Sequence, residues 1–393
     1  MKKKYLMMLL AALFVGSLLL AACQSQSNRT AQPTATVPAQ PTVPVTPTVA
    51  TPTPTRFLPE SILGISGGLF TSATYPRIPW VRLGYPTCGR NNLSGQPLQD
   101  AISSYHSQGI HVLLTYCQVP GESLFDTTQL SDAAQAGADA VQCGNEQIKQ
   151  SSATLYVSPE RFARFFALCQ SAMQAVRPEM PIILGAMDPL VFPDDEAKML
   201  NQVRYLDAMQ AAMNSSVNPG GNWNWHAQTL GLIDSWHNGY PSADTNNLYG
   251  LFTFWAQQLH ININSGHLGE HLWVVEGTGC VNGCGIDASN PREVAISHIL
   301  TLITDVQTTK KYQVPFFYFP VMDFYAPASG WIYGILNQHG AHKPLRQDLP
   351  MDARTLEMSC SSGKVVVADQ EQLLSKLYNG CTLPANYASI LES

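Results

Sequence analysis

The chain has 393 residues, of which 13% are charged, and it carries a formal net charge of −6. This length is ample for one large domain. An acidic chain with few charges lacks the basic surface on which nucleic-acid binding depends. The composition therefore argues against a nucleic-acid partner and suits an uncharged substrate.

Residues 1–22 have the pattern of a secretory signal, with lysines at positions 2–4, an apolar run from Tyr5 to Leu20, and the ending Leu20-Ala21-Ala22-Cys23. The apolar run is short for a membrane span. The ending resembles the bacterial lipoprotein box, which implies cleavage before Cys23 and a lipid on its thiol. We therefore expect an extracytoplasmic protein anchored to the membrane; the alternative is a plain cleaved signal followed by an ordinary cysteine. Without the three lysines, the net charge becomes (22 − 3) − 28 = −9.

Residues 23–56 form a Pro- and Thr-rich linker with Thr-Pro repeats. Such a segment cannot bury enough apolar surface to offset the cost of ordering it. Pro-rich chains extend by about 3.1 Å per residue, so a stretch of about 27 residues could span on the order of 80 Å. We expect an extended stalk between the anchor and the domain.

Nine cysteines are present, and Cys23 is assigned to the lipid, which leaves eight. An even number in an exported protein favours disulfides over free thiols or zinc. The pairing cannot be deduced from the sequence. Cys280 with Cys284 and Cys360 with Cys381 are the pairs to test first.

Short apolar runs alternate with longer amphipathic segments from residue 62 onward. Residues 159–176 predict a helix, with a proline at its start and apolar residues near one face at helical spacing; these are Phe162, Phe165, Phe166, Leu168, Cys169 and Met173. Residues 291–305 predict another helix. The predicted strands are 62–65, 80–85, 111–116, 140–144, 181–185, 232–236, 272–276 and 315–319.

Eight strands alternating with helices predict an α/β fold, a (β/α)8 TIM barrel over residues 57–348. An open doubly wound sheet is the alternative, but its phosphate-binding glycine turn has only the incomplete candidate Ile65-Ser66-Gly67-Gly68. Residues 349–393 predict a small C-terminal extension with a strand at 364–367 and a helix at 370–378. We expect a disulfide to hold this extension against the barrel.

Two predicted strands end in a glutamate. Glu146 follows the fourth strand, after Asn145, and Glu276 ends the seventh. Active sites of TIM barrels lie at the carboxyl ends of the strands, so both side chains should face one volume. Glycoside hydrolysis needs such a pair, one to protonate the leaving oxygen and one to attack or to activate water. Alternatively, either glutamate simply begins a loop.

The motifs Gly144-Asn145-Glu146 and Val274-Val275-Glu276-Gly277 resemble those of the clan A glycoside hydrolases, which include cellulase- and mannanase-like enzymes. The resemblance covers most of residues 62–346. Trp80-Val81-Arg82-Leu83-Gly84 resembles the second strand of that group. His237-Asn238-Gly239-Tyr240 resembles the end of its sixth strand.

The resemblance implies a retaining mechanism, in which Glu146 is the general acid/base and Glu276 the nucleophile. The two carboxyls should then stand about 5–5.5 Å apart. It also implies that Asn145 binds the sugar 2-hydroxyl, that Arg82 keeps Glu276 ionised, and that His237 and Tyr240 line the cleft. Glu146 should have a raised pKa.

The sequence also departs from this group. The third strand ends in Tyr116-Cys117, where many relatives have a histidine, and two residues rather than one separate His237 from Tyr240. The eighth strand lacks the tryptophan that usually supports the sugar. Tyr318, Phe324 or Trp331 are the candidates to replace it.

Other clusters favour structural roles. His260, His267 and His271 precede the seventh strand, at the wrong end for a barrel site, so solvated or capping roles are favoured over a metal. Cys280 and Cys284 could be half of a zinc site, but no matching second pair exists. We favour packing for Trp223 and expect no metal and no cofactor.

The favoured function is a glycosidase that cleaves a surface poly- or oligosaccharide, and we expect it to be a monomer. The alternative is a surface carbohydrate-binding barrel protein without turnover. A deacetylase or lyase on the same fold would need metal ligands or a different base, which the strand ends do not supply. The Gly-x-Ser-x-Gly motif of esterases and the Walker loop do not occur in the sequence.

Overall fold

The computed structural model describes residues 63–67, 78–89, 92–119, 126–149, 155–188, 196–234, 247–277, 291–319, 321–322, 334–337, 339–345 and 355–392. The predicted signal, the lipidated Cys23 and the linker lie outside these ranges. Within them, no helix has the length and apolar character that a membrane crossing requires.

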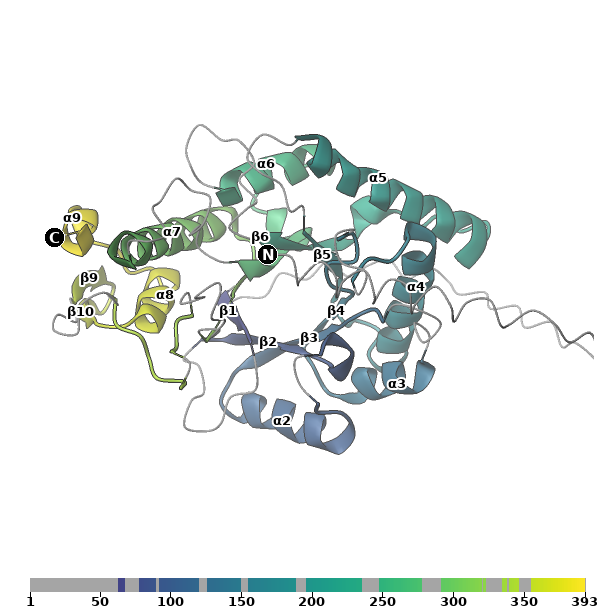
Figure 1. Cartoon of the computed structure of the whole chain (residues 1–393), viewed down its shortest axis with the longest axis horizontal. Coiled ribbons are helices and arrows are strands. Elements are labelled where there is room, and N and C mark those ends of the chain that lie inside the picture. Colours follow the sequence, from purple (N-terminus) through teal and green to yellow (C-terminus); the bar gives the residue numbers. More distant parts are fainter. Residues whose placement is uncertain are drawn as a thin grey trace, which may run out of the picture. The chain divides into compact units, whose positions relative to one another are not determined.

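Eight parallel strands form a closed barrel in which each strand pairs with its sequence neighbours and β1 pairs with β8 (Figure 1). The predicted TIM barrel is therefore confirmed, and the alternative of an open doubly wound sheet is wrong. The strands are β1 (Leu63–Ser66), β2 (Trp80–Gly84), β3 (His111–Tyr116), β4 (Ala140–Cys143), β5 (Ile182–Met187), β6 (Thr229–Asp234), β7 (Leu272–Gly277) and β8 (Phe316–Tyr318).

Most predicted strands match to within one or two residues, but the sixth does not. It begins at Thr229, three residues before the predicted start, and ends at Asp234. Thr229 and Gly231 interrupt the apolar run, so hydrophobicity alone placed the strand too late. Gly231 is needed because a Cβ there would lie 2.2 Å from the backbone carbonyl oxygen of Gly185 on β5.

Helices surround the ring of strands (Figure 1). They are α2 (Gly95–Ser107), α3 (Thr127–Gln135), α4 (Pro159–Val176), α5 (Glu196–Ala212), α6 (Asn247–Gln258) and α7 (Pro291–Tyr312). Short helical turns occur at Pro86–Cys88, Met213–Val217, Trp225–Ala227 and Leu268–Glu270. Helix α7 continues seven residues beyond its predicted end at residue 305, through a segment that carries Lys310 and Lys311 in its last turn.

The helix α4 has the predicted bounds and buries the predicted aromatic and sulfur-containing residues, Phe162, Phe165, Phe166, Cys169 and Met173. Leu168 is the exception, because it is 37% exposed. Trp223 is buried and its ring lies 6.0 Å from that of Phe166, edge to face. The prediction that Trp223 packs in the core is confirmed.

The barrel interior holds its own apolar cluster, separate from the larger core between strands and helices. Its members come from seven strands and alternate with residues that face the helices; they are Trp80, Leu113, Ala140, Ile183, Ala186, Ile233, Trp273, Val275 and Phe317. TIM barrels are filled by such layers. Arg82, Thr115 and Gln142 follow Trp80, Leu113 and Ala140 by two positions, and all three are polar. The next layer toward the carboxyl ends of the strands can therefore supply functional groups.

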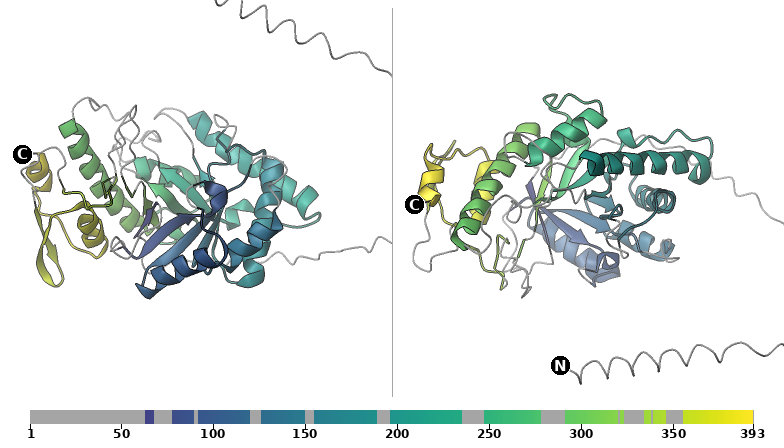
Figure 2. Two further views of the ribbon diagram at one scale, coloured as in Figure 1. Left: turned by 60° about the horizontal axis from the view of Figure 1, so that its bottom comes forward. Right: turned by 45° about the horizontal axis from the view of Figure 1, so that its top comes forward.

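The C-terminal residues form an antiparallel hairpin and two helices, β9 (Leu356–Cys360), β10 (Gly363–Val367), α8 (Gln370–Tyr378) and α9 (Tyr387–Glu392). The helices α8 and α9 lie against α7 (Figures 1 and 2). The predicted helix is confirmed, the first strand of the hairpin was missed, and the predicted Cys360–Cys381 disulfide is present. The buried residues of α8 belong to the same core as the barrel.

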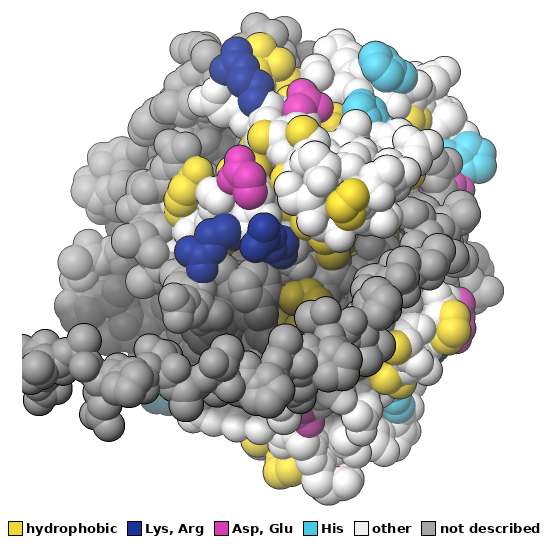
Figure 3. All heavy atoms as spheres, turned by 90° about the vertical axis from the view of Figure 1, so that its right-hand side faces the viewer, with side chains coloured by type: hydrophobic (Ala, Val, Ile, Leu, Met, Phe, Trp, Pro, Cys, Tyr) yellow, Lys and Arg dark blue, Asp and Glu magenta, His cyan; other side chains and the backbone are white. Residues whose placement is uncertain are grey.

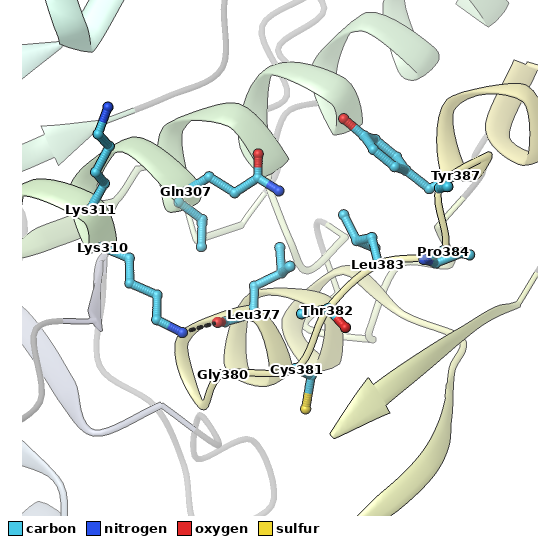
Figure 4. Close-up of a pocket in the computed structure, with 12 residues that line it drawn as sticks. Gln307, Lys310, Lys311, Leu377, Gly380, Cys381, Thr382, Leu383, Pro384 and Tyr387 are labelled. Atoms are coloured by element: carbon cyan, nitrogen blue, oxygen red, sulfur yellow. Dashed lines mark hydrogen bonds between the residues drawn. The ribbon is translucent and has the colours of Figure 1, made fainter. Parts of the chain in front are cut away.

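A hollow of about 600 Å³ lies between α7 and this C-terminal segment (Figure 4). Lys310 Nζ donates a hydrogen bond of 3.0 Å to the Leu377 carbonyl across its edge. None of the described residues that line it is acidic or a histidine. The described lining of the hollow therefore offers no carboxylate or imidazole for catalysis.

Two further disulfides join consecutive parts of the barrel. Cys88 pairs with Cys117, and Cys143 at the end of β4 pairs with Cys169 in α4. Cys280 and Cys284 lie outside the described residues, so their predicted pairing stays a prediction.

On the face drawn in Figure 3, basic and acidic side chains of the described residues lie near one another instead of forming a large patch of one sign.

A pair of buried acids connects β6 with α7. Asp234 ends β6, Asp305 lies in α7, and each is 2% exposed. Burial raises the pKa of both carboxyls, and the charge of Asp234 raises that of Asp305 further. The folded chain therefore keeps protons on this pair at pH values at which the unfolded chain has lost them.

This pair predicts that stability falls as the pH rises. Above about pH 4 the folded state binds more protons than the unfolded state, so the free energy of unfolding decreases through the raised pKa values. Asp305→Asn, which cannot ionise, should raise the free energy of unfolding at pH 8 by about 1 kcal/mol or more and flatten its pH dependence. Urea unfolding from pH 5 to 8 measures both, with the exposed Asp100→Asn as control; equal slopes in the three proteins would contradict the prediction.

Candidate active site

A cavity of about 290 Å³ opens at the carboxyl ends of the barrel strands. Both predicted catalytic glutamates line it, together with Asn145 and Arg82. Its other described lining residues come from the ends of β1 to β4 and the loops that follow them; they are Ser66, Gly67, Gly84, Thr87, Cys88, Thr115, Cys117, Gln118, Val119 and Leu155.

Arg82 is the centre of this site. It is 5% exposed, and its Nη1 lies 2.5 Å from Glu276 Oε1 in a buried ion pair. The same nitrogen donates to Ser66 Oγ at 2.9 Å, Nε donates to Gln142 Oε1 at 2.9 Å, and Nη2 donates to Asn145 Oδ1 at 2.8 Å. The planar guanidinium thus fixes side chains from β1, β4 and β7, together with that of Asn145 just beyond β4, in one arrangement.

Glu276 reaches the cavity because β7 contains an irregularity. Leu232 pairs with Val274 and Ile233 pairs with Glu276, so the register skips Val275. Val275 and Ile233 both lie in the barrel interior. Strict alternation after Val275 would turn Glu276 toward the helices, whereas the extra residue lets it face inward beside Ile233. Bulges of this kind often redirect a side chain next to an active site.

Two glutamines hold Asn145. Gln142 Nε2 donates to Asn145 Oδ1 at 3.2 Å. The Gln118 side-chain oxygen accepts from the Asn145 backbone N–H at 2.8 Å. Its amide nitrogen donates to the Asn145 carbonyl at 2.7 Å and to the Leu155 carbonyl at 2.8 Å. Because Asn145 Oδ1 accepts from both Arg82 and Gln142, the amide nitrogen is the group that can donate to a ligand in the cavity.

The backbone at the end of β4 takes two unusual conformations. Gly144 has φ +98°, and Glu146 has φ +49° although it is not a glycine. A side chain in this left-handed region costs on the order of 1–3 kcal/mol and is frequent at functional sites. Glu146 N–H donates to the Ala186 carbonyl on β5 at 3.2 Å, which helps to hold the conformation.

Glu146 lies in surroundings that favour its protonated form. Burial raises its pKa to about 7, while a hydrogen bond from Lys149 lowers the pKa and the charges of Asp188 and Glu276 raise it. The expectation of a raised pKa at this residue is confirmed. One carboxyl of the cavity is thus paired with an arginine, and the other can hold a proton near neutral pH.

Of the remaining predicted site residues, the structure describes Tyr318 alone. Tyr318 on β8 is completely buried in the core, and it is not among the described residues that line the cavity. His237, Tyr240 and Trp331, as well as Phe324, lie outside the described residues. Of the three histidines before β7, His267 pairs with Glu270 at 2.7 Å, His271 is buried, and the ring of His260 stacks at 6.1 Å on that of His226.

Several residues of the site were missed by the sequence analysis. Gln142 could have been found, because a polar residue inside a buried strand needs a partner. Gln118 and Lys149 carry no comparable signal. The position after β3, where a histidine was missing, is occupied by the Cys88–Cys117 disulfide, which forms part of the cavity wall.

No protein-family model matches this chain, and no curated protein matches it. Similar solved structures include GH5_18 from Streptomyces cattleya in complex with GlcNAc, at 14% identity over 68% of each chain and a TM-score of 0.40. A family 39 glycoside hydrolase from Bacteroides cellulosilyticus WH2 is 12% identical over 79% of this chain and 68% of that chain, with a TM-score of 0.42. A glycoside hydrolase family 17 β-1,3-glucanosyltransferase from Rhizomucor miehei is 14% identical over 72% and 96%, with a TM-score of 0.44. Similarity this low concerns the fold and assigns no activity to this chain.

The backbone before Glu146 predicts a sharp sensitivity at Gly144. In Gly144→Ala the new Cβ would lie 2.6 Å from the Phe162 ring and would also be strained at φ +98°. We expect the free energy of unfolding to fall by about 2–4 kcal/mol, of which about 1 kcal/mol is backbone strain. The matched control is Gly137→Ala, at φ +88° with open space around it, which carries the strain alone. Equal losses in denaturant unfolding of the two variants would show that the contact with Phe162 is unimportant.

Proposed function

We propose that this chain is a retaining glycoside hydrolase that acts on a poly- or oligosaccharide at the cell surface. The observation that supports the proposal most strongly is the contrast between the two cavity glutamates. Glu276 is ion-paired with Arg82, whereas the pKa of Glu146 is raised to about 7. A glycosidase needs one carboxylate and one carboxylic acid at the same bond.

In this mechanism Glu276 attacks the anomeric carbon, and Glu146 gives its proton to the oxygen of the departing sugar. The glycosidic C–O bond breaks and a glycosyl ester forms on Glu276. Water then attacks the same carbon, its proton passes to Glu146, and the Glu276 carboxylate is released. Each proton and electron pair is returned at the end of the cycle, so no cofactor is required.

The neighbouring polar groups fit roles in binding the sugar. We assign Asn145 to the 2-hydroxyl of the sugar at the cleaved bond, since its amide nitrogen is available toward the cavity. Hydrogen bonds to this hydroxyl strengthen in the transition state. We also propose His237, Tyr240 and Trp331 as substrate contacts, on the basis of their sequence positions; the fully buried Tyr318 is left out.

A carbohydrate-binding protein without turnover is the other candidate. Binding alone would not benefit from a carboxyl with a pKa near neutrality, and acid catalysis would. The raised pKa of Glu146 therefore favours the enzyme.

Substitution of the two glutamates tests the proposal. A panel of aryl β-glycosides and polysaccharides first identifies a substrate. Glu276→Ala should then reduce kcat by at least about 10³-fold while binding persists, and Glu146→Ala should retain rate chiefly on aryl glycosides with good leaving groups. Glu179→Ala, which removes an exposed carboxylate before the start of β5, is the control.

Proton NMR of the sugar released at early times then distinguishes the mechanisms. Retention of the anomeric configuration is expected, and inversion would require a base and a water in place of the nucleophile. A Glu276→Ala variant with unaltered turnover would refute the assignment of Glu276 as the nucleophile and the retaining mechanism with it.

We further infer that the chain is exported and lipid-anchored through Cys23. The basic and apolar residues before Cys23 support this inference, and the disulfides of the barrel suit an oxidising compartment. Expressed in a bacterium, the full chain should partition with the membrane and take up labelled fatty acid. Cys23→Ser should lose the label and appear in the soluble fraction, whereas Cys360→Ser should keep it; label on the Cys23→Ser chain would contradict the assignment.

A further inference from the structure

A lysine lies between two carboxylates at the edge of the cavity. Lys149 Nζ is 2.7 Å from Glu146 Oε1 and 3.0 Å from Asp188 Oδ2. The Asp188 side chain is 2% exposed, that of Glu146 17% and that of Lys149 23%. The lysine therefore links the proposed general acid to a buried acid that no step of the proposed mechanism uses.

The local backbone creates this contact. The Lys149 N–H donates to the Glu146 carbonyl at 3.0 Å, which closes a turn directly after the left-handed residue Glu146. Asp188 comes from a different element, since it follows the last residue of β5. The turn after β4 and the end of β5 thus present the two carboxylates to the same ammonium group.

The chemistry of lysine determines which oxygen of Glu146 can hold the proton. An ammonium group only donates hydrogen bonds, so the oxygen that it contacts must act as an acceptor. Oε1 is that oxygen. Because the carbonyl oxygen of a carboxylic acid is a better acceptor than its hydroxyl oxygen, the lysine favours the acid proton on Oε2. A carboxyl that was free to rotate would present its proton to the leaving oxygen only part of the time.

Asp188 limits how strongly the lysine stabilises ionised Glu146. The Lys149 charge is shared with Asp188, whose own negative charge acts on Glu146 in the opposite sense. The charges with the largest effect on Glu146 are those of Lys149, Asp188 and, across the cavity, Glu276, which is itself paired with Arg82. A lysine alone would favour a permanently ionised glutamate, which could not act as an acid.

We propose that Lys149 and Asp188 are positioning residues for the general acid: Lys149 fixes the acid proton of Glu146 on Oε2, and Asp188 shares the lysine so that Glu146 can still be protonated. This proposal rests on the proposed function, because it assigns a task to the same site. The titration of Glu146 can be measured whether or not a substrate has been identified.

The two residues should shift the titration of Glu146 in opposite directions. Lys149→Met removes the donor to ionised Glu146, so its pKa should rise by about one unit. Asp188→Asn removes a negative charge and leaves the lysine to Glu146 alone, so the pKa should fall by about one unit. The double variant should return close to the wild-type value, and Lys149→Arg, which keeps the charge, should shift least.

The direct measurement is a 13C NMR titration of the Glu146 carboxyl in the full chain labelled with 13C-glutamate, assigned by comparison with Glu146→Gln. Where turnover is found, the basic limb of kcat/KM against pH should move with the NMR value, because loss of the acid proton ends catalysis. Lys149→Met should also lower kcat more for poor than for good leaving groups, since only the former depend on the position of the acid proton. Far-UV circular dichroism confirms that each variant is folded.

Shifts in the same direction, or none, in two folded single variants would overturn the proposal. If the double variant shifts as far as either single variant, the balance between Lys149 and Asp188 is likewise refuted. Opposite NMR shifts without hydrolysis of any substrate would instead uphold this inference and reject the proposed function, so the two failures are distinguishable.

Discussion

The site depends on one buried cation. Arg82 is 5% exposed and its ion pair with Glu276 spans the barrel from β2 to β7. Removing a charged group from water costs several kcal/mol unless partners satisfy it, and four side chains accept hydrogen bonds from this guanidinium. Removing Arg82 would leave the Glu276 carboxylate buried without this partner. The same interaction thus contributes to the closure of the barrel and to the state of the proposed nucleophile.

Around this fixed centre, departures from regular backbone aim the two glutamates. The register skip at Val275 turns Glu276 inward, and the left-handed conformations at Gly144 and Glu146 end β4 abruptly. A regular β7 strand would have kept the alternation of side chains between the two faces of the sheet and pointed the Glu276 carboxyl toward the helices. The strain at Glu146 is sustained by the hydrogen bond to β5, by the turn to Lys149 and by Gln118. The Cys143–Cys169 disulfide ties the same strand end to α4.

The sequence predicted the barrel because eight short apolar runs alternate with longer amphipathic segments, and each run is a local signal. It also pointed to the two glutamates, since each follows or ends an apolar strand, whereas Arg82 was implied by the resemblance of its strand to that of a known family. It placed β6 too late, because Gly231 is required by a close backbone contact and not by hydrophobicity. Lys149, Asp188 and Gln118 could not be assigned roles. Their contacts join β3, β4 and β5, and the strain at Glu146 that brings Lys149 close exists only in the folded chain.

The charges at the cavity fit the uncharged substrate that we propose. With Glu146 protonated, Arg82 offsets Glu276 and Lys149 offsets Asp188, so these five groups sum to zero. In the proposed mechanism, this group of residues becomes negative as Glu146 gives up its proton, at the moment when an oxocarbenium-like sugar gains positive charge. Electrostatic stabilisation is then largest in the transition state and small in the ground state, which is the condition for catalysis instead of tight binding. If Lys149 acted on Glu146 alone, ionised Glu146 would be too stable to recover its proton from water. Because Asp188 shares the lysine, the buried aspartate completes the charge balance that lets the acid be regenerated.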